Sequence, residues 1–288
     1  MNGIVIVDKP QDWTSQDVTA RLRRVFSTRR IGHGGTLDPM ATGVLPVFVG
    51  RATRGVEFFE HAEKTYETVL RLGVQTDTQD ITGTVLQRRE VNISQEQLLE
   101  TLNAFRGEIL QIPPMYSALK VNGQKLCDLA RKGKEVARPS RPVTIHELNL
   151  LSFDGQNAAL RVRCSKGTYI RTLCEDIGTA LGCLGTMASL RRTQAGDYTI
   201  AQAVPLQQLL EAEHPEEFLL PLDSMFLQYP ALTLTPNQET RCRNGNPFTH
   251  PAKNGTYRAY SQKGEFLMLA TVEDGMMRTV KSFFQVGE

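Results

Sequence analysis

The loop 32–46, GHGGTLDPMATGVLP, contains a single carboxylate, Asp38, that could do chemistry. Asp38 precedes Pro39, which disfavours helical geometry at the aspartate. The loop's glycines allow close approach of a ligand. A carboxylate held rigidly at a loop apex suits covalent chemistry on a sugar or base. Two simpler interpretations compete: Asp38 as an ordinary turn residue, and GHGG as a phosphate cradle, although the Lys-Ser/Thr continuation of that motif is missing.

The elements around this loop can be predicted from apolar periodicity. Ile4–Val7 is typical of a buried strand, and Ser15 can cap a helix whose apolar stripe is Val18, Leu22, Val25 and Phe26. Residues 31–46 hold four glycines and two prolines, which favours a shaped loop over the whole range. Beyond it, Tyr66–Leu72 alternates as a half-buried strand does, with Tyr66, Thr68, Leu70 and Leu72 on one face.

Two further helices are predicted downstream. Ser94 and Gln97 form a capping box before the apolar positions Leu98, Leu102 and Phe105. The strand LRVRC at 160–164 leads into a helix with Ile170, Leu173, Ile177 and Leu181 on one face. Arg171 lies one residue off that face, where an i,i+4 surface pair with Glu175 is the simplest prediction.

The last part of the chain changes character. The acidic stretch 206–220 predicts a connector, and from Ala231 short strands alternate with turns. We therefore predict two domains, a catalytic domain at 1–228 and a β-rich module at 229–288. A module of about 60 residues is expected to dock onto the larger domain because its own core is small.

Charge and cysteine content narrow the class of protein. The net charge is only +2, but residues 21–30 carry five arginines and no acid, and a second basic stretch, 113–141, carries seven Lys or Arg. Such patches can follow a phosphate backbone. Five cysteines without a CxxC pair indicate neither a disulfide framework nor a zinc site, and favour a reducing cytoplasm. No segment has the length of an apolar membrane span or the pattern of a secretion signal.

Five blocks of sequence together resemble the TruB family of tRNA pseudouridine-55 synthases. The loop block is similar to the family's catalytic-aspartate motif. The others are VDKPQDWTS, KTYETVLRLGVQTDTQDITG, PPMYSALKVNGQKLCDLARKGKEV and CSKGTYIRTLCEDIG, followed by SLRRTQAG. The C-terminal module resembles a short PUA RNA-binding domain. The blocks occur in the family's order across nearly the whole chain.

The resemblance implies a role for each matching residue. Asp38 would be the nucleophile, and Arg171 would pair with it, because a neighbouring guanidinium keeps a carboxylate ionised. Tyr66, otherwise interpretable as a core aromatic, would stack on the flipped uracil and take the proton from C5. The remaining matches would bind substrate: Tyr169 and Leu190 would line the base pocket, His33 would contact the RNA and Asp80 would help hold the T-loop region. Lys9 and Pro10 match a motif whose role looks mainly structural.

The implied fold is α+β, a pseudouridine-synthase fold. It has a mixed, largely antiparallel sheet flanked by helices, a helical RNA-gripping insertion at about 113–141 and a PUA-like β module. The implied reaction is isomerisation of a uridine in the tRNA T loop, without cofactor or metal, by a monomer that needs no obligatory protein partner. Three alternatives stay open: a non-catalytic RNA-binding protein or tRNA folding chaperone, a synthase guided by RNA and protein partners, and a nucleotide-binding enzyme that uses GHGG.

Overall fold

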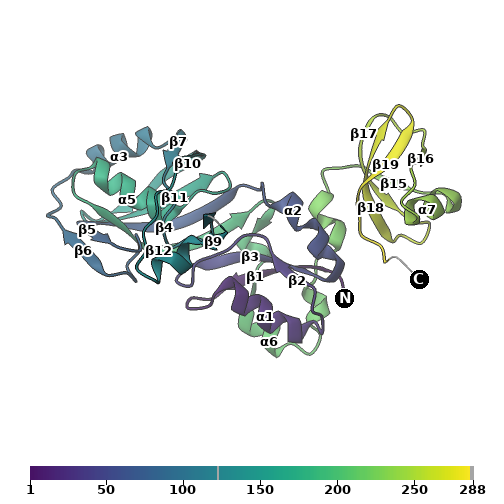
Figure 1. The fold of residues 1–288 in the computed structure, drawn as a ribbon, viewed down its shortest axis with the longest axis horizontal. Coiled ribbons are helices and arrows are strands. Elements are labelled where there is room, and N and C mark those ends of the chain that lie inside the picture. The colour runs from purple at the N-terminus through teal and green to yellow at the C-terminus, as the bar shows by residue number, and fades with distance from the viewer. Residues whose placement is uncertain (122, 286–288) are drawn as a thin grey trace.

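The computed structural model describes residues 1–121 and 123–285, and the larger part of the chain is built on one ten-stranded sheet (Figure 1). Its strands are β1 (Gly3–Lys9), β2 (Ile31–His33), β3 (Thr42–Val49), β4 (Lys64–Leu72), β7 (Gly107–Gln111), β10 (Arg141–Phe153), β11 (Asn157–Cys164), β12 (Gly185–Ala195), β13 (Tyr198–Thr199) and β14 (Val204–Pro205). The order across the sheet is β14-β1-β3-β12-β4-β11-β10-β7, with β2 beside β3 and β13 beside β12. Only β1–β14 and β3–β12 are parallel pairs, which confirms a mixed, largely antiparallel sheet.

Helices flank this sheet at both ends. They are α1 (Ser15–Val25), α2 (Val56–Phe59), α3 (Gln95–Ala104), α5 (Ile170–Ala180) and α6 (Leu206–Glu211). α5 packs on β12 and β4 with α3 beside it, whereas α1 and α6 lie together near β1 and β2 (Figure 1). The main core lies between these layers, where Leu22, Leu70, Leu160 and Leu173 are fully buried.

Most of the predicted local structure is present, with two corrections. Tyr66, Thr68, Leu70 and Leu72 are all buried on β4, and the capping box at Ser94 starts α3. The cap of α1, however, is Thr14, which forms a capping box with Asp17. The predicted loop 31–46 was too long, because its apolar ends pair as strands β2 and β3 and leave only 34–41 irregular.

The insertion at 113–141 contains little helix. Its described residues, 113–121 and 123–141, hold the short strands β8 (Lys120–Val121) and β9 (Gln124–Lys125) and one five-residue helix, α4 (Leu126–Ala130). The prediction of a helical insertion is therefore correct only for α4. Another hairpin, β5 (Val74–Thr76) and β6 (Val85–Arg88), projects from the end of β4, and residues 77–84 connect its strands.

The C-terminal residues form a second, five-stranded sheet. Its elements are β15 (Ala231–Thr233), α7 (Pro236–Arg243), β16 (Phe248–Thr249), β17 (Gly255–Tyr260), β18 (Phe266–Glu273) and β19 (Met276–Ser282), with strand order β15-β17-β18-β19-β16. Figure 1 shows this module beside α2. An aromatic cluster joins the two parts, since Phe226 packs against Phe283 at 5.7 Å and against Phe58 at 5.2 Å between ring centroids. The domain boundary at 228/229 and an RNA-binding role for the module stay predictions.

In the described ranges, no helix combines the length and apolar character needed to cross a bilayer.

Candidate active site

The loop 34–41 that carries Asp38 is tethered on both sides of the aspartate. The Ser15 hydroxyl accepts from the Leu37 amide at 2.9 Å and lies 3.2 Å from the Leu37 carbonyl. On the other side, the Pro39 carbonyl accepts from the Lys9 ammonium at 3.2 Å and from the Asp12 amide at 2.8 Å. Lys9 is fully buried, which agrees with the mainly structural role predicted for it. These contacts hold the Asp38 backbone in one place.

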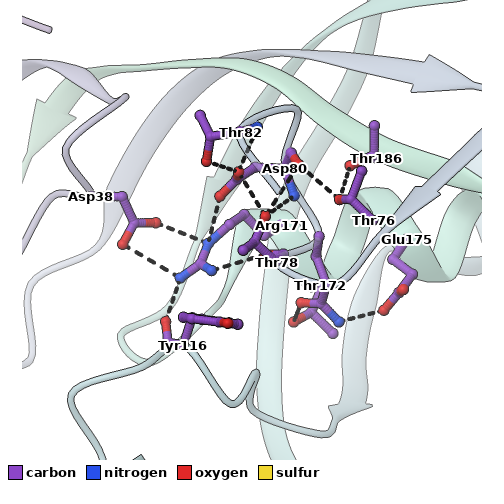
Figure 2. A network of polar contacts seen from close by, with 11 residues as sticks. Asp38, Thr76, Thr78, Asp80, Thr82, Tyr116, Arg171, Thr172, Glu175 and Thr186 are labelled. Atoms are coloured by element: carbon purple, nitrogen blue, oxygen red, sulfur yellow. Dashed lines mark hydrogen bonds and ion pairs between the residues drawn. The ribbon is translucent and has the colours of Figure 1, made fainter. Parts of the chain in front are cut away.

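Asp38 is paired with Arg171, the second residue of α5. The Arg171 Nε lies 2.9 Å from Asp38 Oδ2, and its Nη2 lies 3.4 Å from Oδ1 (Figure 2). The same guanidinium donates to the backbone carbonyls of Tyr116 at 2.8 Å and Thr78 at 3.1 Å. Arg171 is only 4% exposed, so it is a fixed structural cation whose fork orients the carboxylate.

This geometry overturns the simplest prediction for Arg171, a surface pair with Glu175. Glu175 instead accepts from the side chains of Gln75 and Gln79. The i,i+4 spacing on α5 is real, but the Asp38 carboxylate and two backbone carbonyls together satisfy the buried guanidinium better than the single carboxylate of Glu175 would.

Asp80 lies behind Arg171 and shapes the turn that follows β5. Its carboxylate accepts from the hydroxyls of Thr78 and Thr82 and from the Thr82 amide, and Oδ2 lies 4.0 Å from Arg171 Nε. Figure 2 shows Asp80 and Asp38 approaching the same guanidinium. Asp80 is 5% exposed, so its structural task is to hold this turn and to share the charge of Arg171.

The electrostatics around Asp38 balance opposing effects. Burial raises the pKa of the Asp38 carboxyl, the Arg171 and Lys9 charges lower it, and Asp80 raises it again. Together these effects raise the pKa of Asp38 above that of an ordinary aspartate. A carboxylate with a raised pKa is a better nucleophile and base than a free one, and Arg171 limits the shift.

Tyr66 and Leu190 face the site from adjacent strands of the sheet. Tyr66 on β4 is 9% exposed and Leu190 on β12 is 8% exposed. Burial raises the pKa of the Tyr66 hydroxyl, which therefore stays neutral at physiological pH; the charge of Arg192 opposes that shift and the charge of Asp38 adds to it. A ring and an aliphatic side chain on neighbouring strands suit the two faces of a planar base.

Tyr169 and His33 lie at other edges of the same region. The backbone of Tyr169, at the start of α5, exchanges two hydrogen bonds with the Gln111 side chain, at 3.0 and 3.2 Å. Burial raises the pKa of the Tyr169 hydroxyl, with Asp38 and Arg171 as neighbouring charges. His33 ends β2, its pKa is lowered by burial and by Arg192, and its Nδ1 is buried without a partner among the described residues.

The structure therefore gathers Asp38, Arg171, Asp80, Tyr66 and Tyr169, which come from four separate stretches of sequence. The sequence did not point to the Tyr116 and Thr78 carbonyls, because a backbone acceptor carries no residue-type signal. It also did not single out Arg192, although this residue lies in the SLRRTQAG block. The neighbouring Arg191 forms an ion pair with Asp8, with 2.8 Å between Arg191 Nη2 and Asp8 Oδ2.

The donors and acceptors of the site suit acid–base and covalent chemistry. Within residues 1–121 and 123–285, no group of three His, Cys, Asp or Glu side chains could hold a metal ion. At its centre lies the Asp38 carboxylate, which has a raised pKa and is oriented by the guanidinium of Arg171.

Two family models match consecutive parts of the chain. Residues 23–170 match the N-terminal domain of the TruB family pseudouridylate synthases, and residues 171–227 match the tRNA pseudouridylate synthase B C-terminal domain. The first match includes Asp38, Tyr66 and Asp80. The boundary between the matches falls between Ile170 and Arg171, at the start of α5.

Curated relatives and solved structures agree with these matches. The chain is 46% identical over 285 residues to tRNA pseudouridine synthase B of Pseudomonas fluorescens, covering 96% of this chain and 93% of the relative. It is 38% identical over 289 residues to the protein of that name from Clostridium kluyveri, covering 98% and 100%. Its fold is similar to that of a chain in a Cbf5-Nop10-Gar1 complex, with a TM-score of 0.73, 23% identity and coverage of 98% of this chain and 85% of that one. A chain in an H/ACA RNP bound to substrate RNA gives a TM-score of 0.72 at 22% identity, with the same two coverages. The family matches and the near full-length relatives together establish that this chain belongs to the TruB family of pseudouridylate synthases.

Proposed function

We propose that this protein isomerises one uridine in the T loop of tRNA, at position 55, to pseudouridine, with Asp38 as the nucleophile. The observation that most supports this function is the Asp38 carboxylate, which is held by two nitrogens of the buried Arg171 in a region that also contains Tyr66. The relatives in two distant bacterial genera are both named tRNA pseudouridine synthase B, which supports tRNA as the substrate.

The reaction breaks the N1–C1′ glycosidic bond, turns the uracil in its pocket and forms a C5–C1′ bond. The proton on C5 leaves and N1 regains a proton, so no atoms of the nucleotide are gained or lost apart from this exchange. Attack of Asp38 on C6, attack on C1′ and removal of a ribose proton all require an ionised carboxylate, which Arg171 favours. Tyr66 stacks on the uracil, and its neutral hydroxyl takes the C5 proton while it passes its own proton to solvent. Tyr169 and Leu190 line the pocket.

A uridine inside a folded loop must be flipped out before it can reach Asp38. The cost is a few kcal/mol. Stacking on an aromatic ring returns about 1–3 kcal/mol per base, so Tyr66 offsets much of it. In this proposal His33 contacts the RNA beside the extruded nucleotide and Asp80 helps hold the T-loop region.

Exposed basic residues are suited to hold the tRNA backbone. All five arginines of 21–30 are exposed, as are six of the seven Lys or Arg in 113–141. Phosphate contacts from these residues would position the T arm, and its shape would provide most of the selectivity.

The proposed setting is a monomer that acts in the cytoplasm without an obligatory protein partner. All five cysteines are free thiols, which suits a reducing compartment. The C-terminal module, in this proposal, adds a PUA-like RNA contact.

Release of tritium from C5-labelled uridine in an unmodified tRNA transcript tests the proposal directly. The wild type should release tritium, and Asp38→Asn should release none while it still binds the transcript in a filter assay. Tritium release by Asp38→Asn at the wild-type rate would remove Asp38 from the mechanism. Binding without release by the wild type would instead favour the non-catalytic RNA-binding or chaperone function.

A further inference from the structure

Arg192 is a buried cation without a carboxylate partner. It is 1% exposed, yet no described carboxylate lies within 4.0 Å of its guanidinium, in contrast to Arg171 and Arg191. Its Nε donates to the Val44 carbonyl at 2.7 Å and its Nη2 to the Gly35 carbonyl at 3.1 Å. Nη1 donates to no carbonyl or carboxylate in the described part of the chain.

Arg192 lies directly beside the proposed catalytic tyrosine. In the pairing of β12 with β4, Arg192 is opposite Tyr66, and Leu190 is opposite Thr68. Directly opposed residues of neighbouring strands share a face of the sheet. The guanidinium therefore lies on the side of the sheet from which Tyr66 and Leu190 serve the base pocket.

Other cationic or unpartnered groups surround Arg192. Lys64, two residues before Tyr66 on β4, donates to the Ala62 carbonyl at 2.5 Å, and its ammonium lies 5.9 Å from the centre of the Phe59 ring. Burial, assisted by the charges of Arg192 and Lys166, lowers the pKa of Lys64 to about 8. His33 is also close enough for Arg192 to lower its pKa, and its buried Nδ1 is unpartnered in the described ranges.

A glycine backbone lies between the two cations. Gly35 has φ +113°, and a β-carbon at this position would lie 3.5 Å from Arg192 Nη1 and 4.0 Å from Lys64 Cε. The Gly35 backbone thus brings Arg192 and Lys64 to opposite sides of one residue, in a conformation that disfavours a side chain. A partly buried group of like charges without a carboxylate lacks a counter-ion, and a bound anion would supply one.

We propose that Arg192 and Lys64 bind a phosphate of the substrate RNA backbone next to the flipped uridine. The inference rests on the proposed placement of the uracil between Asp38 and Tyr66, because the phosphates of that nucleotide lie only a ribose away from its base. Arg192 and Lys64 would be positioning residues: they set the depth of the nucleotide and touch no reacting atom. A role of Arg192 in packing alone would explain its two carbonyl bonds but not the second cation, Lys64, on the other side of Gly35.

The test compares two T stem-loop oligonucleotides that differ at one linkage. One has ordinary phosphates, and the other has a neutral methylphosphonate on one side of the target uridine, with matched 2′-O-methyl groups in both. Binding is measured by fluorescence anisotropy in the Asp38→Asn background, so a failure of the proposed chemistry leaves this measurement intact. Each flanking linkage is tested in turn.

We expect one methylphosphonate to weaken binding by about 10- to 100-fold, the effect of losing a hydrogen-bonded charge. In Lys64→Gln the two oligonucleotides should bind within about threefold of each other, while Lys64→Arg should restore the difference. Arg191→Gln is the matched control: it changes the neighbouring arginine, which already has Asp8 as partner, and should retain the full effect. Thermal unfolding identifies any variant that fails to fold, and Lys64→Met, which keeps the apolar stem without the charge, then takes the place of Lys64→Gln.

Two outcomes would overturn the proposal. In the first, neutralising either linkage weakens binding equally in the parent protein and in Lys64→Gln. In the second, inorganic phosphate at constant ionic strength competes with the RNA although both oligonucleotides bind alike. The site would then take free anions and not the substrate backbone.

Discussion

At the scale of single residues, the pairing of Asp38 with Arg171 decides what the site can do. The guanidinium contacts both carboxylate oxygens and two backbone carbonyls at once. A lysine has the same charge but only one nitrogen on a flexible stem, so it cannot satisfy these four acceptors together. The fork therefore provides orientation as well as charge.

Arg171→Lys should lower kcat/KM for tritium release by about 100-fold or more, because a misplacement of about 1 Å costs that much. Arg163→Lys is a matched control, since Arg163 is 39% exposed and pairs with two surface glutamates. The control should stay within about twofold of the wild type. Equal activities of Arg171→Lys and the wild type would show that charge alone suffices.

The raised pKa of Asp38 predicts the acid limb of the pH profile. The limb of kcat/KM should lie above the roughly 3.9 of a free aspartate, with activity lost as the pH falls through the raised value and the carboxylate is protonated. Asp80→Asn should move the limb to lower pH, since the Asp80 charge raises the pKa of Asp38 and shares Arg171. A limb that stays in place or moves upward in Asp80→Asn would contradict this electrostatic role.

At the scale of elements, α5 combines packing with the placement of charge. Ile170, Leu173 and Ile177 bury its apolar face, and Arg171 leaves the first turn toward the loop. One of its acids, Asp176, is half-buried, and burial together with the neighbouring Glu175 raises its pKa to about 6. The helix therefore carries a carboxylate that the fold disfavours in its charged form.

Asp176→Asn should raise the free energy of unfolding at pH 8 by at most about 3 kcal/mol, from the difference between the folded pKa of about 6 and the ordinary aspartate value of 3.8. A folded pKa above the unfolded one means that Asp176 contributes stability below pH 4, and that this contribution is lost as the pH rises through 6. The gain from the substitution should accordingly be smaller at pH 5. Urea unfolding at both pH values measures it, with Glu100→Gln on the exposed face of α3 as control. A gain that is independent of pH would reject the explanation.

At the scale of the whole molecule, the catalytic sheet, the insertion and the C-terminal module offer separate surfaces to a large substrate. The module is joined to the sheet by the Phe226–Phe283 cluster and by an ion pair of 2.5 Å between Lys281 and Glu57. The basic insertion lies next to the site itself, because the carbonyl of Tyr116 accepts from Arg171. Substrate contacts at Tyr116 would therefore be transmitted to the Asp38–Arg171 pair.

Replacing Lys120, Lys125, Lys132 and Lys134 with glutamine should weaken tRNA binding and flatten its salt dependence. Each lost phosphate contact reduces the slope of log K against log salt by about 0.7 to 0.9. Replacing four exposed bases elsewhere, Arg88, Arg89, Arg161 and Arg278, provides a control of equal charge. An unchanged slope in the insertion variant would remove these lysines from the interface.

Local structure followed from the sequence wherever a short-range pattern decides it. The alternation of β4 and the capping box of α3 depend on neighbours within a few residues, and both predictions are confirmed. The limits of the loop around Asp38 were wrong, because glycine and proline obscured two strands that pair with distant partners. The family could be identified from five blocks of residues in order, since each block is specific in residue type and spacing.

Only the tertiary structure decided which residues that lie far apart in the sequence come into contact. Arg171 meets Asp38 across 133 positions, and its other acceptors are main-chain carbonyls that no residue type announces. Arg191 and Arg192 are neighbours of the same residue type, so the sequence does not separate their roles. Successive side chains of a strand point to opposite faces, and therefore Arg191 pairs with Asp8 whereas Arg192 is buried beside Tyr66. The sequence by itself determined which groups are available for chemistry, and the long-range packing of the sheet determined which of them meet.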